Sequence, residues 1–258
     1  MNAPFLDVCN LTLQYKTAGH LVTATYDVSF QAHESERLIL LGPSGCGKST
    51  ILKAIGGYIS PARGKIRLRG KEVTKPGADR GMVFQEFDQL LPWKSALENI
   101  VFAICETRPV PRSQAKDEAW ELLRKVNLTS FANSYPHELS GGMKQRVAIA
   151  RCLGLRSEII LMDEPFASLD ALTRQKMQEE LLNLWADTRC TLVFVTHSID
   201  EAIILGSRIV LLSPHPGQVV AELNGVIAHL DEEKNAELAG LRARIARILF
   251  KDQCDYTI

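Results

Sequence analysis

Apolar residues along this chain recur with two different spacings. The run Arg37–Leu41 has four consecutive apolar positions, which is typical of a strand buried on both faces. Between about residues 94 and 155 the spacing becomes helical, and residues 115 to 126 place Ala, Leu and Val at i, i+3, i+4 and i+7. Further strands are predicted at Leu11–Tyr15, Val22–Phe30, Ile159–Met162, Thr191–Val195 and Ile209–Leu212, and further helices at Thr173–Trp185 and Asp231–Phe250. Strands that alternate with helices predict an α/β protein with a parallel sheet, interrupted by a helical insertion.

A glycine-rich loop follows the strand that ends at Leu41. Its sequence, Gly42-Pro43-Ser44-Gly45-Cys46-Gly47-Lys48-Ser49, fits the pattern G-x-x-x-x-G-K-[ST], and a helical segment starts at Thr50. The glycines let backbone N–H groups turn inward at a helix N-terminus, where they bind phosphate. The lysine adds a positive charge for the β- and γ-phosphates, and the serine hydroxyl is a ligand for Mg²⁺. The loop therefore predicts nucleotide binding.

Two acids, Asp163 and Glu164, follow the predicted strand Ile159–Met162. Ligands bind at the carboxyl edge of a parallel sheet, so both carboxylates are expected to face the phosphates. Asp163 is suited to holding Mg²⁺ and Glu164 to positioning the attacking water. The alternative is a helix-capping cluster in the turn before Pro165.

The composition excludes several classes of protein. Thirty Lys and Arg balance thirty Asp and Glu, so the broad basic surface of a nucleic-acid binder is not expected. No apolar stretch reaches the length of a membrane span, and the first residues lack a secretory signal, which favours a cytoplasmic protein. Six scattered cysteines without a CxxC pair favour neither a zinc site nor a disulfide framework.

A second glycine-rich loop opens a predicted helix at Leu139-Ser140-Gly141-Gly142-Met143-Lys144-Gln145-Arg146. One nucleotide does not need two phosphate loops, but a symmetric dimer can close this loop over the nucleotide of the other subunit. With the phosphate loop and the acidic pair in this order, the sequence resembles the ATP-binding cassette (ABC) ATPases, whose signature reads LSGGQ. Met143 replaces the commonest fifth residue of that signature.

The resemblance implies the fold and its divisions. It implies a P-loop NTPase (RecA-like) core with a parallel sheet, an N-terminal antiparallel β subdomain and an inserted helical subdomain. The ATP-binding domain is then expected over residues 1–225, with the helical subdomain at about 88–155, and a C-terminal helical tail over 226–258.

The resemblance also implies roles for single residues, each with a plainer alternative. Tyr15 is similar to the aromatic that stacks on adenine, or it is a core residue of a strand. Gln85 is similar to the Q-loop glutamine that touches Mg²⁺ or the attacking water, or it is an exposed polar residue. His197 is similar to the switch histidine that contacts the γ-phosphate, or it is a structural residue at a strand end. Ser168-Leu169-Asp170 resembles the D-loop between subunits, and Asp170 is also suited to capping a helix.

Together these features predict an ATPase with Mg²⁺ held by Ser49, Gln85 and Asp163. Lys48 and His197 would stabilise the γ-phosphoryl charge. The segments around Gln85, Asp163 and residues 212–217 are similar to the nitrate/sulfonate/taurine branch of importers.

A single ATPase unit of that branch implies a homodimer, a separate membrane permease, a solute-binding protein, no nucleic acid, and a peripheral place on the cytoplasmic face of the inner (plasma) membrane. Leu90, Leu91 and Trp93 would help form the groove for the permease, unless they only fill the core. A soluble non-transport ABC ATPase and another P-loop phosphotransferase are the alternatives to the importer.

Overall fold

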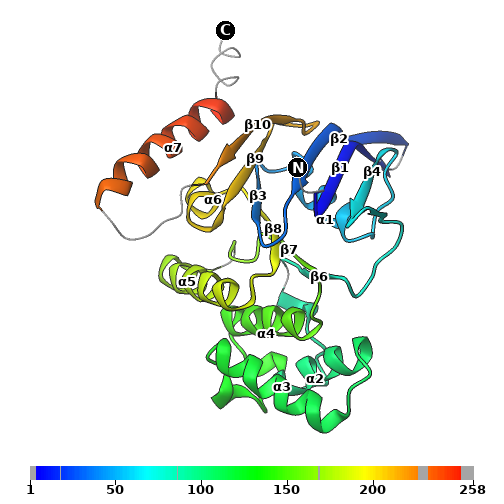
Figure 1. The fold of residues 1–258 in the computed structure, drawn as a ribbon, viewed down its shortest axis with the longest axis vertical. Coiled ribbons are helices and arrows are strands. Elements are labelled where there is room, and N and C mark those ends of the chain that lie inside the picture. The colour runs from blue at the N-terminus through cyan, green and yellow to red at the C-terminus, as the bar shows by residue number, and fades with distance from the viewer. Residues whose placement is uncertain (1–3, 18, 86, 168, 226–231, 251–258) are drawn as a thin grey trace. The chain divides into compact units, whose positions relative to one another are not determined.

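The computed structural model describes residues 4–17, 19–85, 87–167, 169–225 and 232–250 (Figure 1). The chain divides into two compact units. The first combines Met1–Pro76 with Thr191–Ile258, and the second is Gly77–Cys190. Among the described helices, none combines the length and the apolar character needed to cross a bilayer.

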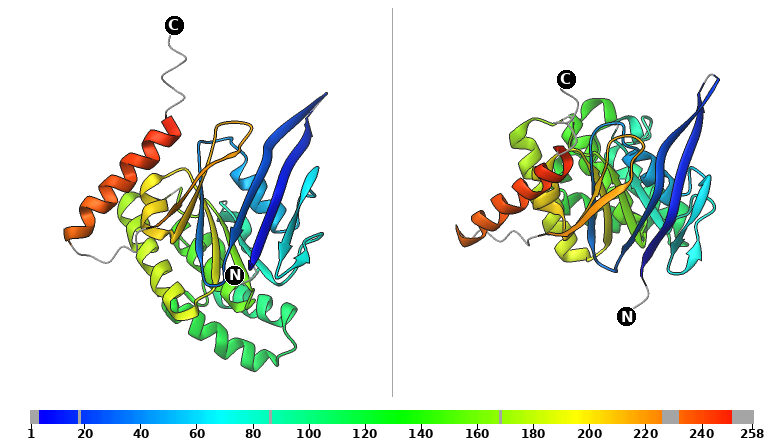
Figure 2. Two further views of the ribbon diagram at one scale, coloured as in Figure 1. Left: turned by 45° about the horizontal axis from the view of Figure 1, so that its top comes forward. Right: turned by 90° about the horizontal axis from the view of Figure 1, so that it is seen from above.

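The first unit contains an antiparallel sheet in the strand order β2-β1-β4-β5. Its long hairpin consists of β1 and β2, which lie side by side in Figure 2. The register shifts between Val8 and Leu11 and again near Leu13, and such irregularities increase the twist of a strand. The bounds are β1 (Leu6–Thr17), β2 (His20–Ala32), β4 (Arg63–Leu68) and β5 (Lys71–Glu72). The expected antiparallel N-terminal sheet is therefore present.

The same unit contains a parallel sheet around β3 (Arg37–Leu41), all five residues of which are buried. Leu38 aligns with Val193 of β8 on one side and with Arg208 of β9 on the other, both in parallel. The strands β8 (Thr191–Thr196), β9 (Arg208–Leu212) and β10 (Val219–Asn224) and the helices α1 (Lys48–Ile55) and α6 (Ile199–Leu205) complete this region of the first unit. Strand β10 is antiparallel to β9. The continuous apolar runs form these strands because both of their faces are covered.

The last helix, α7 (Glu232–Phe250), packs against α6 and β9. Ile245 is fully buried, and Arg242 forms an ion pair with Asp200 at the start of α6. The apolar stripe expected on this tail therefore faces the body of the unit. Residues 226–231 and 251–258 of the expected tail lie outside the described part.

The second unit has two parallel strands, β6 (Arg80–Val83) and β7 (Ile159–Asp163), and four α-helices among its described residues. The expected helical stretch is divided into the helices α2 (Ala96–Thr107), α3 (Arg112–Lys125) and α4 (Gly141–Gly154). Three 3-10 turns accompany them: η1 (Phe87–Gln89), η2 (Thr129–Phe131) and η3 (Pro136–Glu138). The fourth helix, α5 (Ala171–Thr188), follows β7. Pro111 stands at the start of α3, where its missing N–H costs no helical hydrogen bond. Helices α2 and α3 pack together, and Ile100, Ile104, Ala119 and Leu123 on them are buried.

Candidate functional site

The phosphate loop connects β3 to α1 in the first unit, as the sequence predicts. Gly45 and Gly47 have φ angles of 79° and 92°, in the left-handed region that favours glycine. A Cβ on Gly47 would lie 2.5 Å from Cγ2 of Thr25 and 2.8 Å from the carbonyl oxygen of Ala24, both on β2. The last glycine of the motif is therefore required by backbone conformation and by the close approach of a neighbouring strand.

A turn that connects β9 to β10 also packs against this loop. A Cβ on Gly217 would lie 2.1 Å from the carbonyl oxygen of Cys46, and one on Gly42 would lie 2.9 Å from the carbonyl oxygen of Leu212. Gly217 is fixed in turn by hydrogen bonds with the backbone of Ala24 and Tyr26. The sequence pattern marked Gly217 only through its similarity to an importer branch and missed this packing role, although the run Pro214-His215-Pro216-Gly217 is a turn signal.

Lys48 is almost fully buried, with 3% of its surface exposed. Its ammonium group donates hydrogen bonds to the carbonyl oxygens of Gly42 (2.9 Å) and Pro43 (2.8 Å) in its own loop. A buried lysine is stable when its charge meets polar partners, and the phosphate loop supplies them. Ser44 and Gly45 are exposed at the tip of the loop, Cys46 is buried, and Ser49 and Thr50 are half-buried in the first turn of α1.

The other two candidates of the first unit are both exposed. Tyr15 pairs with Val22 across the hairpin, and 48% of its surface is exposed. The alternative of a core aromatic is therefore wrong, and a ring open to solvent is available for stacking. His197 directly follows β8, and Ser198, not His197, caps α6 by accepting a hydrogen bond from the N–H of Glu201.

The short segment around His197 is fixed by hydrogen bonds on both sides. The Thr196 hydroxyl donates to the buried Glu201 carboxylate (2.5 Å) and accepts from the N–H of Ser198 (3.0 Å). These contacts hold the backbone while the imidazole remains exposed. Such a placement suits a side chain that meets a ligand at the end of a parallel strand.

In the second unit, Asp163 is the last residue of β7 and is buried, with 5% exposed. Glu164 follows in the left-handed region at φ 42° and is half-buried. A non-glycine residue in this region is strained, and such strain clusters at functional sites. The capping alternative is wrong because the next helix, α5, is capped by Asp170.

The signature loop lies at the N-terminus of α4. Ser140 is exposed and caps the helix by accepting a hydrogen bond from the N–H of Met143 (3.3 Å). Gly141 starts the helix, and a Cβ on Gly142 would lie 3.3 Å from Cγ2 of Thr173 near the start of α5. Gly142 therefore lies close to the start of α5, and a side chain there would require Thr173 to shift slightly.

Asp170, the D-loop candidate, caps α5. Its carboxylate accepts a hydrogen bond from the N–H of Thr173 (3.0 Å), which lowers the pKa of Asp170 below its ordinary value because the charged form is stabilised. The capping role expected as an alternative is thus confirmed. Ser168 lies outside the described residues.

Gln85 is exposed and follows Phe84 just beyond the end of β6. The three apolar residues expected at the permease groove differ in their exposure. Leu90 is buried, Leu91 is half-buried, and Trp93 is 69% exposed. A purely core role is therefore wrong for Trp93.

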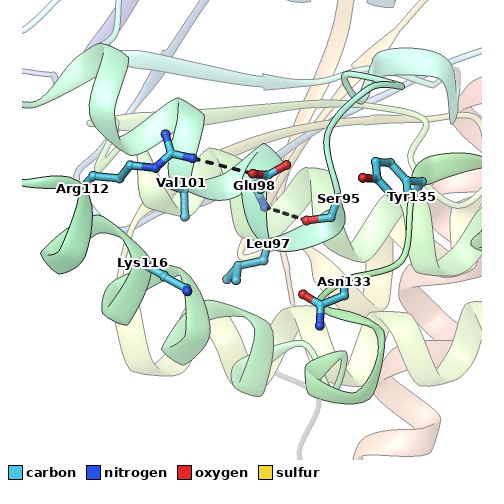
Figure 3. Close-up of a pocket in the computed structure, with 8 residues that line it drawn as sticks. All are labelled: Ser95, Leu97, Glu98, Val101, Arg112, Lys116, Asn133 and Tyr135. Atoms are coloured by element: carbon cyan, nitrogen blue, oxygen red, sulfur yellow. Dashed lines mark hydrogen bonds and ion pairs between the residues drawn. The ribbon is translucent and has the colours of Figure 1, made fainter.

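The second unit has a cavity of about 340 Å³. Figure 3 shows the side chains that line it, which come from α2, α3 and the turn before η3. Ser95 caps α2 there, and Glu98 forms an ion pair with Arg112. None of the predicted catalytic residues lines this cavity. It is therefore separate from the predicted chemistry of hydrolysis.

The predicted Mg²⁺ ligands are divided between the two units. Among the described residues, no group of three or more His, Cys, Asp or Glu is arranged to hold a metal ion. Mg²⁺ commonly uses one or two carboxylates plus the phosphates of its substrate. The buried Asp163 carboxylate of the second unit and the Ser49 hydroxyl of the first are each a donor of the right type.

Comparison with known proteins identifies the family of this chain. Residues 25–167 match the family model described as ABC transporter. The chain is 49% identical over 206 residues to the taurine import ATP-binding protein TauB of Rhizobium johnstonii, covering 80% of this chain and 78% of the relative. It is 44% identical over 221 residues to the bicarbonate transport ATP-binding protein CmpD of Synechococcus elongatus, covering 85% of this chain and 79% of the relative.

The fold is also similar to that of a solved structure. The dimeric post-hydrolysis state of the ATP-binding cassette MJ0796, bound to ADP and Pi, aligns with a TM-score of 0.75 and 34% identity, over 85% of this chain and 98% of that one. The matched family model spans both glycine-rich loops and the acidic pair. The chain therefore belongs to the ABC transporter family, as an ATP-binding ATPase subunit.

Proposed function

We propose that this chain is the ATP-hydrolysing subunit of an importer, which powers the uptake of a small solute of the nitrate, sulfonate or taurine type through a separate membrane permease. The observation that carries the ATPase role is the phosphate loop, whose glycines are required by φ angles and by packing and whose lysine is held by the loop. The importer assignment is supported by relatives named for taurine import and bicarbonate transport. Neither of these names favours the soluble non-transport alternative.

In this proposal the residues of the first unit hold the nucleotide. Tyr15 stacks on adenine, and the loop from Gly42 to Thr50 binds the phosphates through its N–H groups. Lys48 exchanges the carbonyl oxygens of Gly42 and Pro43 for phosphate oxygens, so its positive charge is never left without polar partners. His197 contacts the γ-phosphate from the end of β8.

The residues of the second unit contribute to hydrolysis. Mg²⁺, when bound, neutralises charge on the β- and γ-phosphates. Asp163 and Gln85, with Ser49 of the first unit, hold it. Glu164 orients or deprotonates the attacking water, and the exposed His197 shares with Lys48 the stabilisation of the charge on the γ-phosphoryl group.

Two copies of the chain form the complete sites. Ser140, Gly141 and Gly142 close over the nucleotide bound by the other copy, and Asp170 lies near the contact between copies. The exposed cap at Ser140 and the dimeric state of the solved MJ0796 cassette support this arrangement. Closure around ATP and reopening after hydrolysis would drive the permease between its two states.

The chain would act at the membrane surface, bound to the cytoplasmic side of the permease, in a system that includes a solute-binding protein. Leu91 and the exposed Trp93 support a docking surface for the permease, since aromatic residues are enriched at protein–protein interfaces. The expected domains at 1–225, 88–155 and 226–258 remain predictions.

The test is purification of the chain with and without its permease. We expect Mg²⁺-dependent ATP hydrolysis that is lost in Lys48→Ala, and copurification of a hydrophobic membrane protein from detergent extracts. Hydrolysis that survives in Lys48→Ala would contradict the site. Activity without any membrane partner in extracts of the native host would favour the soluble alternative.

A further inference from the structure

Two glutamines in the second unit surround the backbone of Phe84, the residue directly before Gln85. The N–H of Phe84 donates to Oε1 of Gln89 (3.1 Å), and Nε2 of Gln89 donates back to the carbonyl oxygen of Phe84 (3.1 Å). One side-chain amide therefore binds both backbone groups of a single residue, as a neighbouring strand would. This pairing takes place just past Val83, where β6 ends.

The second glutamine, Gln145, belongs to α4 and is fully buried. Its Nε2 donates to the same carbonyl oxygen of Phe84 (3.4 Å), and its Oε1 accepts from Nε2 of Gln89 (3.3 Å). Arg151, further along α4, donates to the backbone oxygen of Gln89 (2.6 Å). The signature helix thus holds the backbone at the start of the Q-loop through a connected set of hydrogen bonds, which we call the amide clamp (Gln89 and Gln145 on Phe84).

The burial of Gln145 indicates that its amide group has a definite role. A buried amide without hydrogen-bond partners destabilises the fold. The buried amide of Gln145 has such partners in Phe84 and Gln89. Burial by itself favours an apolar side chain, so packing alone does not account for a glutamine at this place. The amide is needed where a backbone must be held in one position.

We propose that Gln89 and Gln145 are positioning residues for ATP hydrolysis, which fix Gln85 relative to the signature helix that starts at Ser140. The inference rests on the proposed role of Gln85 at Mg²⁺ or the attacking water. A displacement of about 1 Å in a catalytic group costs up to about a hundredfold in rate, so a loosened clamp reduces kcat even though neither glutamine touches substrate. ATP affinity is set by the phosphate loop and changes little.

The test is a double-mutant cycle with purified full-length protein. Gln89→Met and Gln145→Met keep the length of the side chain and remove the amide. Each is made in the parent and in Gln85→Ala, and kcat and ATP affinity are measured. The matched control is Gln178→Met, since Gln178 is a buried glutamine on α5 in the same unit.

We expect Gln89→Met to lower kcat about tenfold in the parent and less than twofold in Gln85→Ala, with ATP affinity unchanged within twofold. Gln145→Met should follow the same pattern with a smaller loss, and Gln178→Met should leave kcat within twofold. Hydrogen exchange supplies a direct readout, because the Phe84 N–H loses its acceptor in Gln89→Met and keeps it in Gln145→Met. Should Gln89→Met not fold, Gln145→Met and its cycle decide the question.

An equal loss of kcat in both backgrounds would show a merely structural role and overturn the proposal. No loss in the parent would overturn it as well. A Gln85→Ala enzyme with parental kcat would refute the role assigned to Gln85 under the proposed function, and the amide clamp with it. Failure of the proposed function can be told from failure of the amide clamp, because the former is seen in the single Gln85→Ala variant.

Discussion

Alanine at two glycines of the phosphate loop should have unequal effects. Gly45 and Gly47 both have positive φ angles, so alanine at either is strained by about 1–2 kcal/mol. The loss of chain freedom in the unfolded state offsets about 0.4–1 kcal/mol of this. Around Gly45 no atom lies within 4 Å of the added Cβ, whereas at Gly47 that atom meets Thr25 at 2.5 Å and the backbone of Ala24 at 2.8 Å.

The backbone of Ala24 cannot move away easily, because its carbonyl oxygen accepts a hydrogen bond from the N–H of Gly217. Forcing an extra methyl group into packed surroundings typically costs about 1–3 kcal/mol. We therefore expect Gly45→Ala to lower the free energy of unfolding by about 1 kcal/mol and Gly47→Ala by about 2–4 kcal/mol. Gly47→Ala should also weaken ATP binding at least tenfold, since the loop must shift.

The assay is urea unfolding without nucleotide, followed by calorimetric titration with ATP. Gly70→Ala is the matched control, because Gly70 has a φ of 77° and open space around it and lies outside the phosphate loop. It should be destabilised as much as Gly45→Ala and bind ATP as the parent does. Equal stability of Gly45→Ala and Gly47→Ala, with parental ATP affinity in both, would refute the packing argument.

Four further predictions address the chemistry and the fold. Glu164→Gln should abolish turnover while ATP still binds, and a dimer should accumulate on a sizing column with ATP; a monomer or parental turnover would contradict the assignment of the base. Tyr15→Ala should weaken ATP affinity by about 1–3 kcal/mol and Tyr15→Phe should be nearly neutral, whereas equal affinities of the two variants in equilibrium titration would exclude stacking. Ser140→Arg should abolish hydrolysis with little loss of ATP binding, and parental activity should rise faster than linearly with protein concentration; strictly linear activity from a proven monomer would rule out composite sites. Glu118→Gln should lower the free energy of unfolding by about 1 kcal/mol at pH 7, because the hydrogen bond from Arg108 holds the pKa of Glu118 below its ordinary value of 4.5. Because the folded pKa lies below 4.5, this stabilisation is present above pH 4.5 and is lost as the pH falls through the folded pKa. The difference between the two proteins in denaturant unfolding should therefore shrink steadily below pH 4.5, and a difference that stays constant as the pH falls would contradict the ion pair.

The sequence by itself determined the type and order of most of the main elements and indicated which residues are candidates for the site. Short apolar runs bounded by turn residues, such as Arg37–Leu41 before Gly42, favour strands buried on both faces, and the residues that follow them are then expected at a sheet edge. The phosphate loop and the signature loop each combine a helix start with glycines at fixed spacing, so both were predictable from local chemistry. For the same reason the capping role of Asp170 was predictable, because an aspartate directly before a helical segment is a common N-cap.

Only the tertiary structure decided features that depend on residues far apart in the chain. The sequence left open whether Tyr15 and Trp93 are core residues, because an aromatic in an apolar run is compatible with either face; their exposure depends on which neighbours cover them. The need for glycine at position 47 comes partly from β2, about twenty residues earlier, and partly from its own φ angle. The amide clamp joins Gln89 to Gln145 across more than fifty residues, and two polar side chains with no shared motif become partners only when α4 packs beside η1. Local sequence fixes backbone conformation over a few residues, whereas burial and hydrogen-bond partners are set by packing, which is why these contacts could not be predicted from the sequence.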